Sequence, residues 1–199
     1  MNRHLDAAAP AAALAAADHT LGNTDADLSL LEYGDYECPA CQQAEAPVRH
    51  LVEVFGKRML FVFRHFPWLE LHPQAELAAE AAEAAAAQGQ FWAMHHLLFK
   101  HPHHLTLTAL TRHARAVGLD MNRFNAEMAD RIYTQRVQEH RRAGERNGVR
   151  TTPSFFVNGA LVDVSSGFEK LEEALHAALR TAEHGAAHST ATHATVKQP

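Results

Sequence analysis

The hydrophobic positions in the first third of the chain follow two different periods. The run Leu28–Tyr33 (LSLLEY) is short and apolar, which predicts a buried strand. From Pro39 to Phe55 the apolar residues recur at helical spacing, and Gly56 ends the pattern, so we expect a helix there. A second apolar run, Met59–Phe63 (MLFVF), predicts another buried strand. Strand, helix and strand in this order predict a β-α-β unit with a parallel strand pair.

The period then changes, and the middle of the chain is predicted to be helical. Helical segments are expected, with a break near Gly89, at 73–100, 107–117, 121–129 and 131–146. Two apolar runs follow, 154–157 and 160–164, and Asn158-Gly159 between them is the strongest short signal for a hairpin. The amphipathic segment 168–180 closes the pattern as a helix. The predicted fold class is therefore α/β, with a mixed sheet of four strands or slightly more, flanked by helices.

Length, charge and the two ends of the chain narrow the class of protein. The 199 residues fit one domain, or one domain that carries an insertion, and the formal charge of -5 disfavours a nucleic-acid binder, which is usually basic. No apolar run is long enough to span a bilayer, so we expect no stable membrane insertion. Residues 1–17 are predicted to be a flexible leader on a cytoplasmic protein; the alternative is a weak signal peptide for export. Residues 182–199 are predicted to be a disordered tail.

Both cysteines of the chain lie in one motif, Cys38-Pro-Ala-Cys41, at the predicted turn from strand to helix. The N-terminus of a helix presents unpaired N–H groups and a partial positive charge, which stabilise a thiolate and lower the pKa of a cysteine placed there. Cys38 is therefore the predicted attacking nucleophile, and Cys41 the resolving thiol that breaks a mixed disulfide. The alternatives are half of a zinc site and two inert buried cysteines. The β-α-β setting favours redox chemistry over both.

Several segments together resemble one known family. LEYGDYECPACQQAE, HPQAELAAEAAEAAAAQGQFWAMHHLLF, AVGLD and GVRTTPSFFVNG are similar to the DsbA-like thioredoxin-fold proteins, in register from about residue 18 to residue 180. The resemblance implies a thioredoxin domain in two halves, 18–66 and 149–181, with a helical domain at 67–148 inserted between them. It also implies a reversible disulfide at the Cys-x-x-Cys motif. Ala40 stands where histidine is usual in the best-known members.

The resemblance also nominates residues away from the motif. Pro153, which follows Thr152, falls where the family has a cis proline opposite the cysteines. A cis bond would leave the backbone groups of Thr152 free to pair with a substrate strand. Glu32 lies in the apolar run before the motif, where many relatives carry a buried acid. A desolvated carboxyl has a raised pKa and can carry protons to or from Cys41.

The residues beside the motif are expected at the surface. Pro39 and Tyr36 are assigned to the rim that binds substrate, with Tyr36 as an exposed aromatic side chain. Asp35 and Glu37 are also expected to be exposed, where their negative charge opposes thiolate formation at Cys38.

The 16 histidines raise the question of a metal. A group of them gathers around one predicted helix end, namely His95, His96, His101, His103 and His104. Their spacing matches no metal motif, so we expect solvated or capping histidines and no bound metal. No other cofactor is expected, because a dithiol itself carries two electrons.

These observations predict a thiol-disulfide oxidoreductase that acts on protein thiols and disulfides, together with a redox partner that the sequence does not identify. One alternative is a glutathione-dependent transferase or isomerase on the same fold, which usually needs no second cysteine. The other is a non-enzymatic, His-rich metal-binding or holdase protein.

Overall fold

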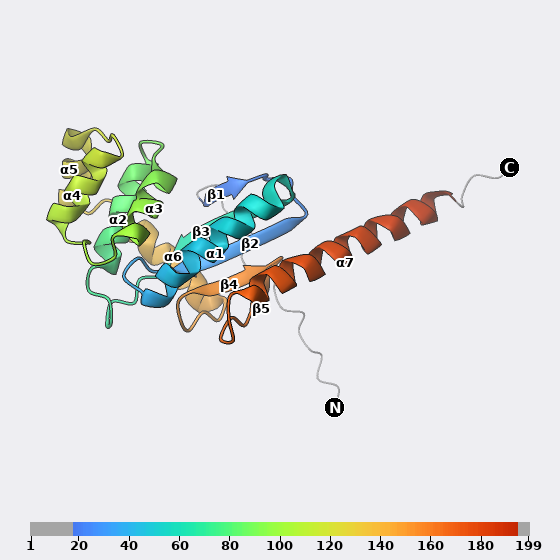
Figure 1. The fold of residues 1–199 in the computed structure, drawn as a ribbon. Coiled ribbons are helices and arrows are strands. Elements are labelled where there is room, and N and C mark those ends of the chain that lie inside the picture. The colour runs from blue at the N-terminus through green and yellow to red at the C-terminus, as the bar shows by residue number, and fades with distance from the viewer. Residues whose placement is uncertain (1–17, 195–199) are drawn as a thin grey trace, which may run out of the picture.

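The computed structural model describes residues 18–194, with side chains described through residue 184, and its sheet draws on both ends of this region (Figure 1). The strands are β1 His19–Gly22, β2 Leu28–Gly34, β3 Met59–His65, β4 Ser154–Val157 and β5 Ala160–Val162. They lie in the order β1-β3-β2-β4-β5. β2 and β3 are parallel, whereas the other neighbouring strands are antiparallel. The predicted mixed sheet is confirmed, and β1 is the strand that the sequence pattern did not indicate.

Seven α-helices are found in the described region. They are α1 Pro39–Phe55, α2 Ala75–Ala86, α3 Phe91–Lys100, α4 Leu107–Ala116, α5 Met121–Ala129, α6 Thr134–Arg146 and α7 Glu169–Ala194. Figure 1 shows α2 to α5 gathered beyond one end of the sheet, while α7 runs out past the other end. Within residues 18–194, none of the helices has both the length and the apolar character of a membrane span.

The alternation of side chains along β2 decides which residues face the cysteines. Leu28 and Leu30 are fully buried in the large core that also holds the apolar residues of α1 and α7. Leu31 and Tyr33 point to the opposite face of the sheet, into a smaller core. Since successive side chains in a strand point to opposite faces, Glu32 shares the face of Leu28 and Leu30 and lies under α1. The strand therefore places an acid in the core beside the Cys-x-x-Cys motif.

The two ends of the chain bear on earlier predictions. The predicted leader, residues 1–17, lies outside the described residues. The predicted disorder from residue 182 is wrong for residues 182–194, because α7 continues to Ala194. This stretch is rich in alanine, the best helix former, and has no proline to stop a helix that the preceding amphipathic segment has begun. Residues 195–199 lie outside the described part of the chain.

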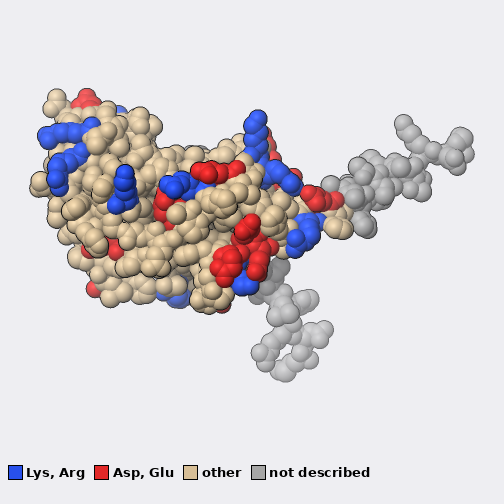
Figure 2. Space-filling view, in the orientation of Figure 1, with Lys and Arg blue, Asp and Glu red and all other residues tan. Residues whose placement is uncertain are grey.

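Charged side chains of both signs lie next to one another over the middle of the face shown in Figure 2. Exposed ion pairs among the described residues include Arg58 with Glu183 at 2.9 Å and Lys170 with Glu173 at 2.7 Å. Exposed pairs of this kind add little to stability, because water already solvates both charges. The fold therefore depends on its two apolar cores.

Candidate active site

The two cysteines lie where β2 passes into α1. Cys38 is the N-cap residue of α1, Pro39 is the first helical residue, and Cys41 lies in the first turn. Proline suits this position because its fixed φ fits a helix and its missing N–H is not needed there. Both cysteines are free thiols; Cys41 is fully buried, whereas 7% of Cys38 is exposed. Pro39 and Ala40 are exposed beside Cys38.

The surroundings of the two thiols drive their pKa values apart. A hydrogen bond from Cys41 is the largest cause that lowers the pKa of Cys38 to about 5. A hydrogen bond with the Thr152 side chain and bonds from the backbone N–H groups of Cys41 and Ala40 also lower this pKa, whereas burial raises it. Burial is the largest cause that raises the pKa of Cys41, and the nearby Cys38 and Glu32 add to it. At neutral pH Cys38 is therefore a thiolate and Cys41 a thiol.

The loop before β4 lies beside the cysteines, because β4 pairs with β2 and begins where β2 ends. The Thr152–Pro153 peptide bond is cis, as the family resemblance implied. When protonated, the Cys38 thiol donates to the Thr152 carbonyl oxygen at a sulfur-oxygen distance of 3.3 Å, although 114 positions separate the two residues. Thr152 itself is only 6% exposed. The fold thus brings together the motif and the two loop residues that the sequence nominated.

Glu32 is buried below the motif, and only 3% of it is exposed. Burial is the largest cause that raises its pKa from an ordinary 4.5 to about 8, and the charges of Glu45 and Cys38 add to it. Its carboxyl group lines a cavity of about 60 Å³ between α1 and α3, which Glu45 and His96 also line. This volume has room for a few water molecules. Glu45 Oε1 lies 2.9 Å from His96 Nδ1, and His96 is 44% exposed. The cavity that Glu32 lines is therefore also lined by a polar side chain that reaches solvent.

Glu45 was not nominated from the sequence. It follows Cys41 by four positions in α1, which places the two side chains on the same face of the helix. The four-residue spacing from Cys41 was the feature of the sequence that could have identified Glu45.

The prediction that Tyr36 is an exposed rim residue is wrong. Only 1% of Tyr36 is exposed. Its ring centroid lies 4.8 Å from that of Phe99, and its hydroxyl shares a hydrogen bond of 3.1 Å with Nδ1 of His95. Helix α3 covers this part of the motif. His95 belongs to α3 and is also buried, so the prediction that it is solvated is wrong. Burial, the largest cause, holds the pKa of His95 well below its usual range.

The acids beside the motif also differ from the prediction. Asp35 is buried, with 2% exposed, and Glu37 is half-buried. Both are held by the segment between β3 and α2: Trp68 N–H donates to Asp35, and Gln74 N–H donates to Glu37. This segment lies more than thirty positions away in sequence, and no local pattern shows that it covers the acids.

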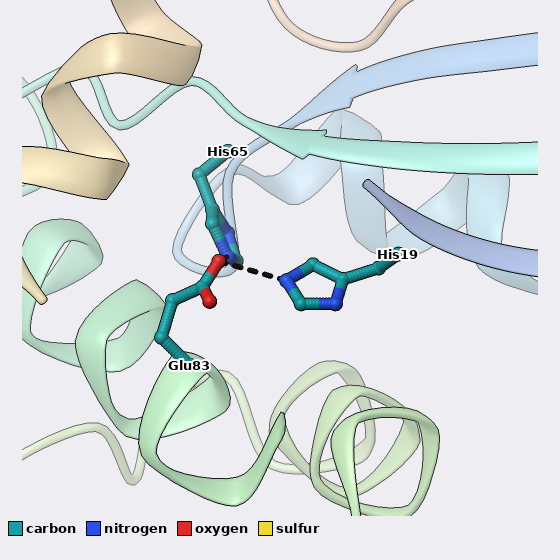
Figure 3. Close-up of side chains that lie close together, drawn as sticks. All are labelled: His19, His65 and Glu83. Carbon is teal, nitrogen blue, oxygen red and sulfur yellow. Dashed lines mark hydrogen bonds and ion pairs between the residues drawn. The ribbon is translucent and has the colours of Figure 1, made fainter. Parts of the chain in front are cut away.

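A second polar cluster lies between the sheet and the helical insertion (Figure 3). His19 of β1 and His65 of β3 both direct Nε2 at Oε1 of Glu83 on α2, at 2.8 and 3.1 Å. All three side chains are at least nine-tenths buried. Burial alone would raise the pKa of Glu83, but hydrogen bonds from the two histidines hold it well below its usual range. The carboxylate is therefore charged inside the protein.

Two imidazoles and a carboxylate are a donor set that divalent first-row metals use, and the three donor atoms lie within 4.8 Å of one another. Glu83 is nevertheless already paired with a permanent cation, because Arg136 Nε lies 2.8 Å from its other oxygen. A divalent ion on Oε1 would share one buried carboxylate with this guanidinium, and like charges repel strongly there. We therefore describe the cluster as a buried ion pair with two hydrogen-bonded histidines that joins the sheet to the insertion.

The low pKa of Cys38 predicts how its alkylation depends on pH. We expect alkylation of the reduced protein at Cys38 to have its pH midpoint near 5, far below the free-thiol value of about 8.5. Cys41 should stay unmodified in the native protein at pH 6.5, because it is buried and protonated. Mass spectrometry of the labelled peptide separates the two sites. A Cys38 midpoint at or above the free-thiol value would contradict the assignment of a thiolate.

Comparison with known proteins identifies the family. The sequence profile of a thioredoxin family matches residues 15–177. The chain belongs to the thioredoxin family. A curated relative, the Na(+)/H(+) antiporter NhaA 3 of Salinispora tropica, is 41% identical over 165 residues, which is 83% of this chain and 25% of that protein. The chain thus spans about a quarter of the length of the curated relatives it matches.

Solved structures share the fold of this chain. Oxidised BdbD from Bacillus subtilis superposes with a TM-score of 0.74 at 20% identity, over 81% of this chain and 92% of that one. A thioredoxin-like oxidoreductase from Silicibacter pomeroyi gives 0.69 at 31% identity, over 82% and 92%. Helices α2 to α6 form the insertion between β3 and β4. The fold, a thioredoxin sheet with a helical insertion, is the one that the sequence resemblance implied.

Proposed function

We propose that this DsbA-like protein is a thiol-disulfide oxidoreductase that exchanges disulfides with protein thiols through Cys38 and Cys41. The observation that carries the proposal is the contrast between the two sulfurs: a thiolate with a pKa of about 5 at the head of α1, and a buried thiol beside it. A stabilised thiolate is a good leaving group, and a neighbouring thiol resolves the mixed disulfide. The 31% identity to a thioredoxin-like oxidoreductase supports the same reaction class.

In the direction of substrate oxidation the pair begins as a Cys38–Cys41 disulfide. A substrate thiolate attacks the sulfur of Cys38, the bond between the cysteines breaks, and Cys41 leaves as a thiolate that takes up a proton. A second substrate thiolate then attacks the substrate sulfur of the mixed disulfide and releases Cys38 as a thiolate. The substrate gives up two electrons to the pair, and the reverse sequence reduces a substrate disulfide.

We assign to Glu32 the transfer of the proton that Cys41 takes up or gives away. Both groups are buried, and the charge of Glu32 adds to the raised pKa of Cys41, so the protonation of one affects the other. A carboxyl group with a pKa of about 8 changes its protonation near neutral pH, which suits a proton carrier. The cavity shared with Glu45 and His96 supplies the path to solvent.

Substrate binding is assigned to the surface around Cys38. Pro39 and Ala40 are exposed there, and the backbone of Thr152 lies directly across from the sulfur. A groove of about 290 Å³ runs beside the 149–152 loop and offers both apolar and charged walls, formed by Phe66, Pro67, Trp68, Glu70, Arg141, Glu145, Val149 and Arg150. An extended polypeptide segment fits such a groove better than a small rigid molecule, because main-chain pairing needs no particular side chain.

The low pKa of Cys38 also indicates in which direction the disulfide is exchanged. Stabilising the thiolate stabilises the reduced pair, so its disulfide is more easily donated to a substrate. We infer that the pair acts as a disulfide donor.

Equilibration with glutathione buffers tests the function and its direction. We expect a reversible Cys38–Cys41 disulfide with a reduction potential above that of thioredoxin, which is about -270 mV. The protein should also oxidise a reduced, unfolded protein, with the extent of oxidation followed by alkylation and mass. Failure to form the internal disulfide, or to pass it to protein thiols, would overturn the proposal.

Replacing Cys41 separates the glutathione-dependent alternative from disulfide exchange. A transferase or isomerase would turn over with glutathione when Cys41 is replaced, because its chemistry needs one thiol. Antiport is not carried over from the named relatives, because the match covers only a quarter of those proteins.

A further inference from the structure

Asp35 joins two loops at a single buried carboxylate. Its Oδ1 accepts a hydrogen bond from Glu37 N–H at 2.8 Å, within the loop that leads to Cys38. Its Oδ2 accepts from Trp68 N–H at 2.9 Å and lies 2.8 Å from His72 Nδ1, both in the segment between β3 and α2. No part of this carboxylate is exposed to solvent. Moving it would leave several buried donors without a partner, so the contact is rigid.

The backbone of the same residue touches both cysteines. Asp35 N–H donates to the sulfur of Cys41 at 3.4 Å, and the Asp35 carbonyl oxygen accepts from Cys38 N–H at 3.2 Å. Asp35 therefore connects the segment 68–72, which its side chain binds, to the Cys41 sulfur and the Cys38 backbone, which its peptide groups bind. The proposed disulfide chemistry does not otherwise use this carboxylate.

We propose that Asp35 is a positioning residue, whose buried carboxylate anchors the 35–37 loop so that its own N–H stays on the Cys41 sulfur and Cys41 stays directed at Cys38. His72 and the N–H of Trp68 hold the carboxylate from the other side. This role deepens the proposed thiol-disulfide exchange and rests on it.

The alternative role for Asp35 is purely electrostatic. It predicts the opposite change in the pKa of Cys38 when Asp35 is replaced. A carboxylate near Cys38 disfavours the thiolate, so its removal would lower the pKa of Cys38. In the positioning role its removal loosens Cys41, whose hydrogen bond is the largest cause of the low pKa of Cys38. Loss of the anchor then raises the pKa of Cys38 and makes the reduced pair less stable.

The experiment compares Asp35→Ala and Asp35→Asn with the wild-type chain. The readouts are the pH midpoint of Cys38 alkylation and the equilibrium constant of the pair with glutathione. In Asp35→Ala we expect the acidity constant of Cys38 to fall roughly tenfold. The equilibrium constant for reduction of the Cys38–Cys41 disulfide by glutathione should fall by a similar factor, because each change reflects the loss of about one hydrogen bond. Asp35→Asn should change both in the same direction but by less, because its amide oxygen still accepts from Glu37 N–H.

Asp120→Asn is the matched control, because Asp120 also accepts two backbone N–H bonds, from Asn122 and Arg123, but at the N-terminus of α5 in the insertion. It should leave the Cys38 midpoint unchanged. A lower midpoint in the Asp35 variants, or the wild-type midpoint in both, would overturn the positioning role. Asp35→Asn keeps the size of the side chain, so it decides the question even where Asp35→Ala does not fold. If the wild-type chain exchanges no disulfide at all, the proposed function fails, and the positioning role fails with it.

Discussion

Cys38→Ser is expected to reduce disulfide exchange to the uncatalysed background. A serine hydroxyl cannot form a disulfide, and Cys41 is fully buried, so no sulfur in the variant can meet a substrate. The measurement is the oxidation of a reduced, unfolded protein by pre-oxidised enzyme, with the reduction of insulin disulfides as the reverse assay. Residual turnover above background in Cys38→Ser would show that Cys41 attacks by itself, which would reverse the assigned roles.

Changes at Cys41 should behave differently. In Cys41→Ser the Cys38 thiolate still attacks a substrate disulfide, but nothing resolves the product, so stable mixed disulfides should accumulate on a non-reducing gel and vanish with added thiol. The hydrogen bond from Cys41 is the largest cause of the low pKa of Cys38. Cys41→Ser keeps a donor at that place and Cys41→Ala removes it, so the alkylation midpoint of Cys38 should be higher in the alanine variant. Equal midpoints in the two variants would show that the hydrogen bond does not set the thiolate pKa.

The parts of the fold that sequence predicts are those with a local physical cause. The position of Glu32 in an apolar run favoured a side chain that points into the core, and Glu32 is buried there. The Asn158-Gly159 pair predicted the β4–β5 hairpin, and both residues adopt the positive φ that such a turn requires, 45° and 84°. Pro39 predicted the first turn of a helix, because its fixed φ suits that position without help from the rest of the chain.

The parts that the sequence did not predict depend on segments that meet only in the folded chain. Tyr36 and Asp35 stand in a polar stretch next to the motif, and they are buried by α3 and by the 68–72 segment. β1 has four residues, too few to show a period, and it exists because it pairs with the edge of β3. His19 within it is buried because Glu83 of the insertion accepts its hydrogen bond. Each of these contacts spans more than thirty positions, so no local window contains both partners.

Glu32→Gln is expected to stabilise the protein, by an amount that grows with pH. The pKa of Glu32 is about 8 in the folded protein against an ordinary 4.5, so between these values folding requires the carboxyl to take up a proton. Stability of the wild-type chain therefore falls as pH rises from 4.5 to 8, whereas glutamine does not titrate. Each unit of pKa corresponds to about 1.4 kcal/mol, so the advantage of the variant should approach 5 kcal/mol, to order of magnitude, above pH 8 and disappear below pH 4.5.

Urea unfolding of Glu32→Gln and wild type at several pH values measures this difference. Glu53→Gln is the control, because Glu53 is exposed on the same helix as the motif and its replacement should leave the pH dependence unchanged. A stability difference that is constant with pH would show that Glu32 titrates normally in the folded protein.

The same Glu32→Gln variant should lose activity while it gains stability. Without a titratable group below Cys41, the steps in which Cys41 gains or loses a proton should slow by roughly tenfold or more near neutral pH. Alkylation of Cys38 should change little, because its thiolate is set by Cys41, Thr152 and the first turn of α1. Stopped-flow measurement of the reduction of the Cys38–Cys41 disulfide, from pH 5 to pH 9, separates these outcomes. A stabilised variant with wild-type rates at every pH would leave Glu32 as a buried acid with no part in proton transfer.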